Sequence, residues 1–182
     1  MNILAFAASN SRHSINRELV QFAANKLKSD ILPDAEFQFV DLNNFEMPIY
    51  SIDREHEQGI PKQARDFFER IGTSDAVLVS FAEHNGNVTA AWKNIYDWMS
   101  RIDARVWQDK PMVVMCATPG KRAGASVLGL LEAQLPFFGG KAIAFCGIGS
   151  WSNVWNPDKK KLEDDRDEAR LLSALSLLAG EI

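Results

Sequence analysis

The apolar run Ile3-Leu4-Ala5-Phe6-Ala7-Ala8 leads directly into the polar segment Ser9-Asn10-Ser11-Arg12-His13-Ser14-Ile15-Asn16. A short run of bulky apolar residues is typical of a buried strand. From Asn16 onward the apolar residues take the spacing of an amphipathic helix, with Leu19, Phe22, Ala23 and Leu27 on one face. The polar segment is therefore a turn that connects a strand to a helix.

This turn, which we call the first loop, has the chemistry of an anion site. Three serines (Ser9, Ser11 and Ser14) and Arg12 gather where a helix presents unpaired N–H groups and the positive end of its dipole. A helix cap at Ser14 or Asn16 would also place polar residues here. One cap needs only one such residue, however, and the segment holds several. We therefore expect a phosphate at this turn.

The rest of the chain alternates between apolar runs and helical patterns. The runs lie at residues 3–8, 37–42, 76–81, 112–117 and 142–147. The helical patterns lie at residues 16–28, 62–71, 89–102, 125–135 and 162–178. The runs at 76–81 and 112–117 are continuously apolar, as strands covered on both faces are, whereas residues 37–41 alternate as an edge strand does.

Strict alternation of strands and helices predicts an α/β fold with right-handed crossovers. Five parallel strands in 182 residues indicate a flavodoxin-like doubly wound sheet in the order 2-1-3-4-5, with helices on both faces. We find no repeat, linker or low-complexity tract, so we expect residues 1–182 to form a single domain. Ligands of such sheets bind beyond the carboxyl ends of the strands.

The composition narrows the class of partner. A net charge of −4 argues against nucleic acid. Cys116 and Cys146 lie in apolar runs, so we interpret them as core residues in a reducing compartment and expect no metal site. No basic leader or membrane-length apolar stretch is visible, so we expect a cytoplasmic protein without a membrane partner.

Two further loops are expected to meet the first at the same sheet edge. The second loop, Ala82-Glu83-His84-Asn85-Gly86-Asn87, follows the third strand. Asn-Gly favours a tight turn whose backbone N–H groups could meet the polar edge of a flavin ring, although it often marks only a turn. His84 is a candidate acid or base, since histidine titrates near neutral pH, but a single loop histidine is more often incidental.

The third loop, Thr118-Pro119-Gly120-Lys121-Arg122-Ala123-Gly124, follows the fourth strand. Its glycines allow close approach of a ligand to the backbone, and its two cations could attract a flavin or the phosphate of NADPH. An exposed turn that binds no ligand is an equally good interpretation of this loop. No loop carries the glycine pattern of a dinucleotide site or a P-loop, so a single terminal phosphate such as that of FMN suits the first loop better.

Two segments give the chain a family resemblance. Residues 8–17 resemble the G-S-x-R-x-x-S-x-N signature of the NADPH-dependent FMN reductases. Residues 82–86 and the later Trp92-Lys93-Asn94-Ile95-Tyr96-Asp97-Trp98 resemble that family's P-E-Y-N-x block and its L-K-N-x-x-D-W helix. This sequence differs in having Ala8 for the leading glycine, Arg12 one place away from the family position, and Ala82 and His84 for proline and tyrosine.

The resemblance implies a flavodoxin-like fold, bound FMN and a homodimer or homotetramer. It also implies that NADPH or NADH is the co-substrate, and that a small-molecule electron acceptor such as a flavin, quinone or azo dye is reduced. The serines and Asn16 would hold the phosphate, the second loop would line the ring, and Gly120 would lie near its other edge. The candidate cofactor-binding residues are Ser9, Ser11, Arg12, Ser14, Ile15, Asn16, Ala82, Glu83, His84, Asn85, Gly86, Thr118, Pro119 and Gly120.

We expect a ping-pong mechanism in which the cofactor carries the hydride and electron chemistry. No dedicated catalytic side chain is then required, with His84 as the one possible exception. The alternative is a flavodoxin-type electron carrier without NAD(P)H turnover, which would usually be more acidic than this chain. A third possibility is a domain that kept the fold and lost the flavin.

Three segments remain open to two interpretations each. The apolar residues of the helix at 89–102 spread around more than one face, which indicates either deep burial or a dimer interface. Residues 43–60 form a long connection that is either functional or a cover for the core edge. Trp151 and Trp155 either stack on a substrate or pack internally.

Overall fold

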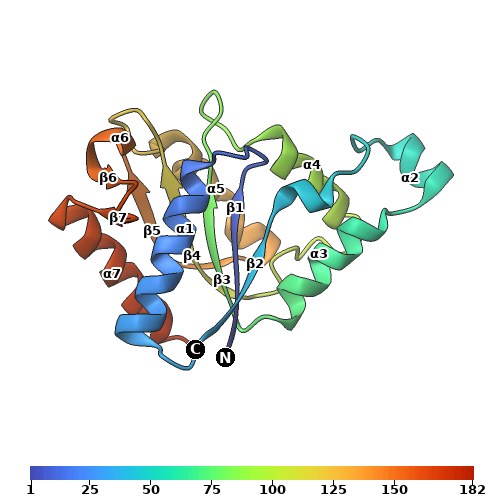
Figure 1. The fold of residues 1–182 in the computed structure, drawn as a ribbon. Coiled ribbons are helices and arrows are strands. Elements are labelled where there is room, and N and C mark those ends of the chain that lie inside the picture. The colour runs from blue at the N-terminus through green and yellow to red at the C-terminus, as the bar shows by residue number, and fades with distance from the viewer.

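The computed structural model describes residues 1–182 and contains a parallel five-stranded sheet in the order β2-β1-β3-β4-β5 (Figure 1). The strands are β1 (Asn2–Ala8), β2 (Glu36–Val40), β3 (Ala76–Phe81), β4 (Pro111–Ala117) and β5 (Lys141–Ile148). The predicted fold class and strand order are confirmed. A second, two-stranded sheet pairs β6 (Trp155–Asn156) with β7 (Lys161–Leu162).

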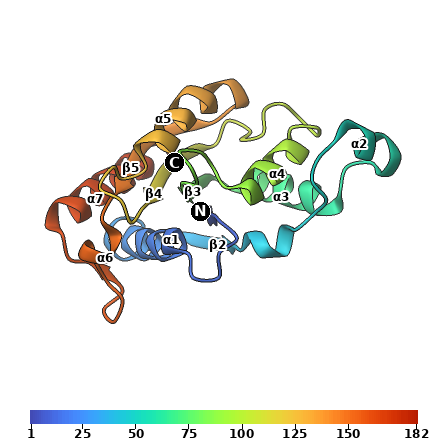
Figure 2. The same ribbon diagram turned by 90° about the horizontal axis from the view of Figure 1, so that it is seen from above.

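Helices cover both faces of the sheet, as Figure 2 shows from above. The helices are α1 (Ile15–Lys26), α2 (Ile52–Gln58), α3 (Lys62–Thr73), α4 (Ala90–Met99), α5 (Ala125–Gln134), α6 (Trp151–Val154) and α7 (Asp165–Ala179). Alternate residues of β1 face opposite layers: Ile3 packs with α1 and α7, whereas Leu4 packs with α3, α4 and α5. The buried apolar side chains thus form two separate cores, one on each face of the sheet.

Several helices and strands begin or end at other residues than predicted, because local hydrogen bonds cap a helix or turn the chain there. Helix α1 begins at Ile15 because Ser14 is its N-cap, and it continues into a π-helical turn, η1 (Leu27–Ile31). Residue 42 does not extend β2 but starts a 3-10 turn, η2 (Leu42–Phe45). The predicted helix at 162–178 begins only at Asp165, since Leu162 pairs with Trp155 in the two-stranded sheet and Asp164 caps the helix.

The long connection after β2 has structure of its own. Residues 46–60, which we call the arm, include α2, a helix with no buried residue. Figures 1 and 2 show the arm projecting from the body of the molecule beside α3 and α4. The sequence pattern did not predict α2, because a helix that packs no apolar face leaves no periodic signal.

Most of the aromatic residues that the sequence left open to two interpretations pack in the core. In α4, Trp92, Ile95, Trp98 and Met99 are all buried in the core. Trp151 and Trp155 are buried and stack on each other, with ring centroids 4.7 Å apart. Cys116 and Cys146 are buried and unpaired with each other, as predicted for core residues.

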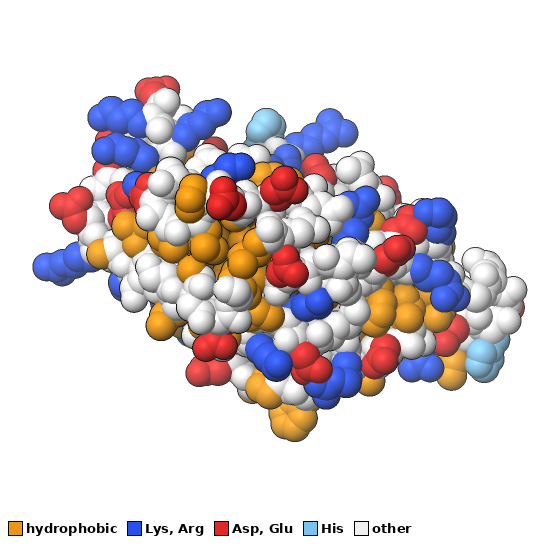
Figure 3. Space-filling model, turned by 90° about the horizontal axis from the view of Figure 1, so that it is seen from below, with side chains coloured by type: hydrophobic (Ala, Val, Ile, Leu, Met, Phe, Trp, Pro, Cys, Tyr) orange, Lys and Arg blue, Asp and Glu red, His pale blue; other side chains and the backbone are white.

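The two ends of the sheet differ in surface character. Figure 3 views the end where the strands begin, and there side chains of both charges are scattered around apolar surface. At the opposite end, three loops enclose a cavity. None of the helices has both the length and the apolar composition needed to cross a bilayer.

Candidate functional site

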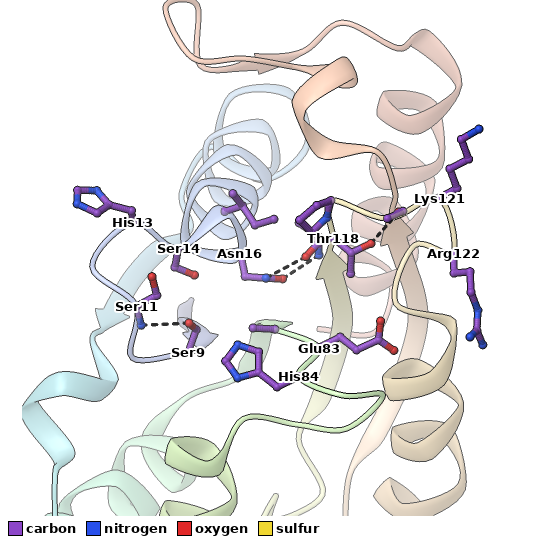
Figure 4. A pocket seen from close by; sticks show the side chains of 15 residues that line it. Ser9, Ser11, His13, Ser14, Asn16, Glu83, His84, Thr118, Lys121 and Arg122 are labelled. Carbon is purple, nitrogen blue, oxygen red and sulfur yellow. Dashed lines mark hydrogen bonds between the residues drawn. The ribbon is translucent and has the colours of Figure 1, made fainter.

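The three loops predicted to meet do enclose one cavity, of about 660 Å³, beyond the carboxyl ends of β1, β3 and β4 (Figure 4). This is the switch point of a doubly wound sheet, where β1 and β3 lie side by side and their crossovers leave in opposite directions. The lining residues are Ser9, Ser11, His13, Ser14, Ile15, Asn16, Ala82, Glu83, His84, Ala117, Thr118, Pro119, Gly120, Lys121 and Arg122.

The first loop presents hydrogen-bond donors to this cavity. Ser14 Oγ accepts from the N–H of Arg17 at 3.2 Å, and Ser9 Oγ accepts from the N–H of Ser11, also at 3.2 Å. Neither hydroxyl donates a hydrogen bond within the chain, so each O–H is free to donate to a ligand. The N–H groups of Ile15 and Asn16, in the first turn of α1, have no intrahelical acceptor. An anion would find several donors here and the positive end of the helix dipole.

The side chain of Asn16 is directed elsewhere. Its Oδ1 accepts from Ser80 Oγ at 2.7 Å and from the N–H of Ala117 at 2.8 Å, and its Nδ2 donates to the carbonyl of Ala117 at 3.0 Å. These three bonds tie α1 to β3 and β4 through the carboxamide. Asn16 also lines the cavity, so its part in a phosphate site stays a prediction, to which its backbone N–H in the first turn of α1 is suited.

The second loop brings three of its five candidate residues to the cavity. Ala82 is nearly buried, Glu83 is half-buried, and the imidazole of His84 points into the cavity in Figure 4. Asn85 and Gly86 both have positive φ, at 54° and 75°, and form the tip of a tight turn. The backbone N–H and carbonyl of His84 pair with those of Asn87 across this turn. The turn prediction is correct, but its tip does not line the cavity.

The third loop forms the opposite wall. Thr118 Oγ1 donates to the carbonyl of Gly120 at 3.0 Å, which holds the loop in a tight bend beside the cavity. Gly124 has a φ of 71°, and a Cβ there would lie 2.3 Å from Cys116 Sγ, so only glycine fits. Lys121 and Arg122 line the cavity at their bases, while their charged ends extend outward (Figure 4).

The buried thiol beneath the third loop is inert at neutral pH. Burial raises the pKa of Cys116 to about 12, and the nearby Glu83 carboxylate adds to the effect. A thiol with so high a pKa is protonated and is a poor nucleophile. Cys116 therefore serves as a packing residue under Gly124.

Not all of the candidate residues line the cavity, and some residues that line it were not candidates. Arg12, Asn85 and Gly86 do not line the cavity, and Arg12 is exposed. His13 and Ala117 line it without having been considered. Lys121 and Arg122 line it as well, and they had been considered only as cations that could attract a flavin or the phosphate of NADPH. His13 lies within the first loop, so proximity in the chain could have found it. Ala117 gave no chemical signal, being the last residue of a strand.

The fold and this cavity together define the class: a flavodoxin-like α/β protein with a cavity at the switch point of its sheet, beside the polar turn that follows its first strand. Residues 1–146 match the family described as NADPH-dependent FMN reductase. The match covers more than half of the chain, so the protein belongs to this family.

Individual relatives agree with that assignment. The 2-hydroxy-1,4-benzoquinone reductase of a Burkholderia species is 31% identical over 121 residues, which are 66% of this chain and 62% of that protein. The NADPH:quinone oxidoreductase of Arabidopsis thaliana is 28% identical over 126 residues, which are 69% of this chain and again 62% of that protein. The matched part of this chain thus spans about three fifths of each relative.

A solved structure shares the fold over nearly the full length. The flavoenzyme NAD(P)H:(acceptor) oxidoreductase FerB of Paracoccus denitrificans superimposes with a TM-score of 0.76 at 22% identity. The superposition covers 98% of this chain and 95% of that one. It extends the likeness past residue 146, through β5 and α7.

Proposed function

We propose that this protein binds FMN and uses NADPH or NADH to reduce a quinone or a similar small-molecule acceptor. The observation that carries the proposal is the first loop, where hydroxyl and backbone donors at a helix N-terminus face a cavity and are not satisfied within the chain. The family and the quinone-reducing relatives support the same chemistry.

The donor set fits the phosphate of FMN. Ser9 and Ser14 would donate from their hydroxyls, and Ile15 and Asn16 from their backbone N–H groups. Ser11, which also lines the cavity, would add a third hydroxyl. A dianionic phosphate gains from each donor and from the dipole of α1.

The remaining cavity fits a planar ring. A volume of about 660 Å³ lies in the range of cofactor sites. The second and third loops form two walls, and in this arrangement backbone N–H groups and Thr118 would meet the polar edge of the ring. When bound, FMN supplies the hydride-accepting and electron-donating chemistry. The chain supplies placement and hydrogen bonds.

His84 is proposed as a proton donor to the acceptor. Reduction of a quinone by hydride also consumes a proton, and His84 directs its imidazole into the cavity from the second loop. The pairing of its backbone with Asn87 holds in place the Cα from which the imidazole extends. Histidine is the side chain that most often transfers protons in enzyme sites.

We further propose a homodimer, or a tetramer built from it, that associates through α4 and α5. An apolar hollow of about 270 Å³ lies between these helices and is lined by Trp92, Tyr96, Trp107 and Leu131, among others. Nearby Phe137 is 81% exposed. Apolar surface of this kind is typical of an interface. Light scattering should give a multiple of the 20.3 kDa chain mass.

The two unpaired cysteines favour a reducing, cytoplasmic location.

The absorbance spectrum of the purified protein tests the proposal. We expect a yellow protein, or one that takes up added FMN, and we expect anaerobic NADPH or NADH to bleach it. Steady-state oxidation of NADPH with benzoquinone then separates a reductase from an electron carrier, and the oxidoreductase relatives favour the reductase. A protein that takes up no FMN would overturn the proposal. A protein that holds FMN and is not reduced by either nucleotide would support the electron carrier instead.

A further inference from the structure

Glu83 makes a contact that its place in the cavity does not require. Its Oε1 accepts from the backbone N–H of Val127, in the first turn of α5, at 3.1 Å. The N-cap of α5 is Gly124, which has no side chain with which to cap the helix. Glu83 therefore takes the place of the missing cap from 44 residues away.

This bond links the two walls of the cavity. Glu83 belongs to the second loop, and α5 starts directly behind the third loop. The same walls touch again at Gly86, where a Cβ would lie 3.5 Å from the Cβ of Ser126. Ser126 Oγ in turn accepts from Arg122 at 3.1 Å. Among these contacts, only the Glu83 bond satisfies a backbone donor of the helix.

We propose that Glu83 is a positioning residue, whose carboxylate holds the second loop against α5 and so sets the width of the slot between the walls. The inference rests on the proposed function, since the slot is where the FMN ring would lie. Glu83 acts here as a hydrogen-bond acceptor toward α5. An uncharged acceptor of the same length should perform the same task.

Two substitutions separate this role from a role of the charge. Glu83→Gln keeps an oxygen that can accept from Val127, whereas Glu83→Ala removes it. Glu132→Ala is the matched control, since Glu132 is an exposed glutamate on the same helix. We expect Glu83→Ala to weaken FMN binding about tenfold, the effect of one lost hydrogen bond in the slot's support. We also expect it to alter the visible spectrum of the bound flavin. Glu83→Gln should stay within about twofold of the unaltered protein, as should Glu132→Ala.

Hydrogen exchange of the protein without FMN provides an independent measurement. In Glu83→Ala, the amides of residues 82–87 and of the first turn of α5 should exchange faster, while Glu83→Gln should retain their protection. If the unaltered protein binds no FMN, the proposed function fails, but the exchange result still decides whether Glu83 joins the walls.

Two results would overturn the inference. Equal exchange in Glu83→Ala and the unaltered protein would show that the bond does not hold the loop. An equal loss of FMN affinity in Glu83→Gln and Glu83→Ala would show that the charge matters, and that Glu83 acts on the cofactor itself.

Discussion

Two irregular segments follow neighbouring strands of the sheet, and they treat their polar groups in opposite ways. The first loop, after β1, leaves the hydroxyls of Ser9 and Ser14 free to donate into a cavity. The arm, after β2, has its backbone groups bound by side chains of α4. Asn94 accepts from the N–H of Tyr50 and donates to the carbonyls of Met47 and Pro48, and Trp98 Nε1 donates to Pro48 at 2.7 Å.

The apolar surfaces of the two segments differ as well. The arm exposes Ile49 and Ile52, which are 75% and 57% accessible, whereas the first loop exposes only polar side chains. The first loop therefore keeps donors that a ligand could use. The start of the arm is instead tied to α4 through the backbone of Met47, Pro48 and Tyr50.

The largest effect is expected at the base of the first loop. Asn16→Ala would leave Ser80 Oγ and both backbone groups of Ala117 without partners. At about 1 kcal/mol for each buried group, the free energy of unfolding should fall by about 3 kcal/mol, as measured by urea denaturation. Asn25→Ala, an exposed asparagine on the same helix, is the control. Equal losses in the two variants would mean that Asn16 does not join the loop to the sheet.

Weakening the attachment of the arm should leave FMN binding in the cavity unchanged. Asn94→Ala removes three hydrogen bonds to the arm, so its local stability should fall by about 2 kcal/mol. Amide exchange in residues 46–60 should rise, and FMN affinity should not change. Loss of FMN affinity in this variant would instead make the arm part of the site.

Two N-cap serines allow a direct test of the same contrast. Ser14 caps α1 and Ser51 caps α2, and each Oγ accepts a backbone N–H at 3.2 Å. Replacement by alanine should cost each helix about 1 kcal/mol. Only Ser14→Ala should also raise the dissociation constant for FMN, by about tenfold, in a fluorescence titration. Unchanged FMN affinity in Ser14→Ala would contradict the phosphate assignment.

The smallest effect is expected from two histidines. His84 points into the cavity, whereas His56 lies exposed on the arm. Removal of the imidazole in His84→Gln should lower the rate of quinone reduction. The loss should be about tenfold or less, because water reaches the open cavity and can replace the donor. His56→Gln should keep the original rate, and an unchanged rate in His84→Gln would remove His84 from the chemistry.

Some features of the molecule could be predicted because they depend on local pattern. The sheet order followed from continuous apolar runs separated by helical patterns, and β3 has the predicted bounds, Ala76–Phe81. The polar lining of the cavity followed from hydroxyls placed at a helix start. These signals lie within a few residues of one another, so a single sequence carries them.

The remaining features depend on contacts between distant residues. Asn16 bonds to Ala117, 101 residues away, and Glu83 bonds to Val127 at the start of α5. Each polar side chain had several possible partners, and nothing local in the chain distinguishes a ligand from a backbone group. The sequence by itself thus determined the fold, the edge of the sheet where the cavity lies and the serines that line it. Only the tertiary structure decided that Asn16 and Glu83 direct their side chains to the protein, because burial and geometry decide which partner a polar group meets.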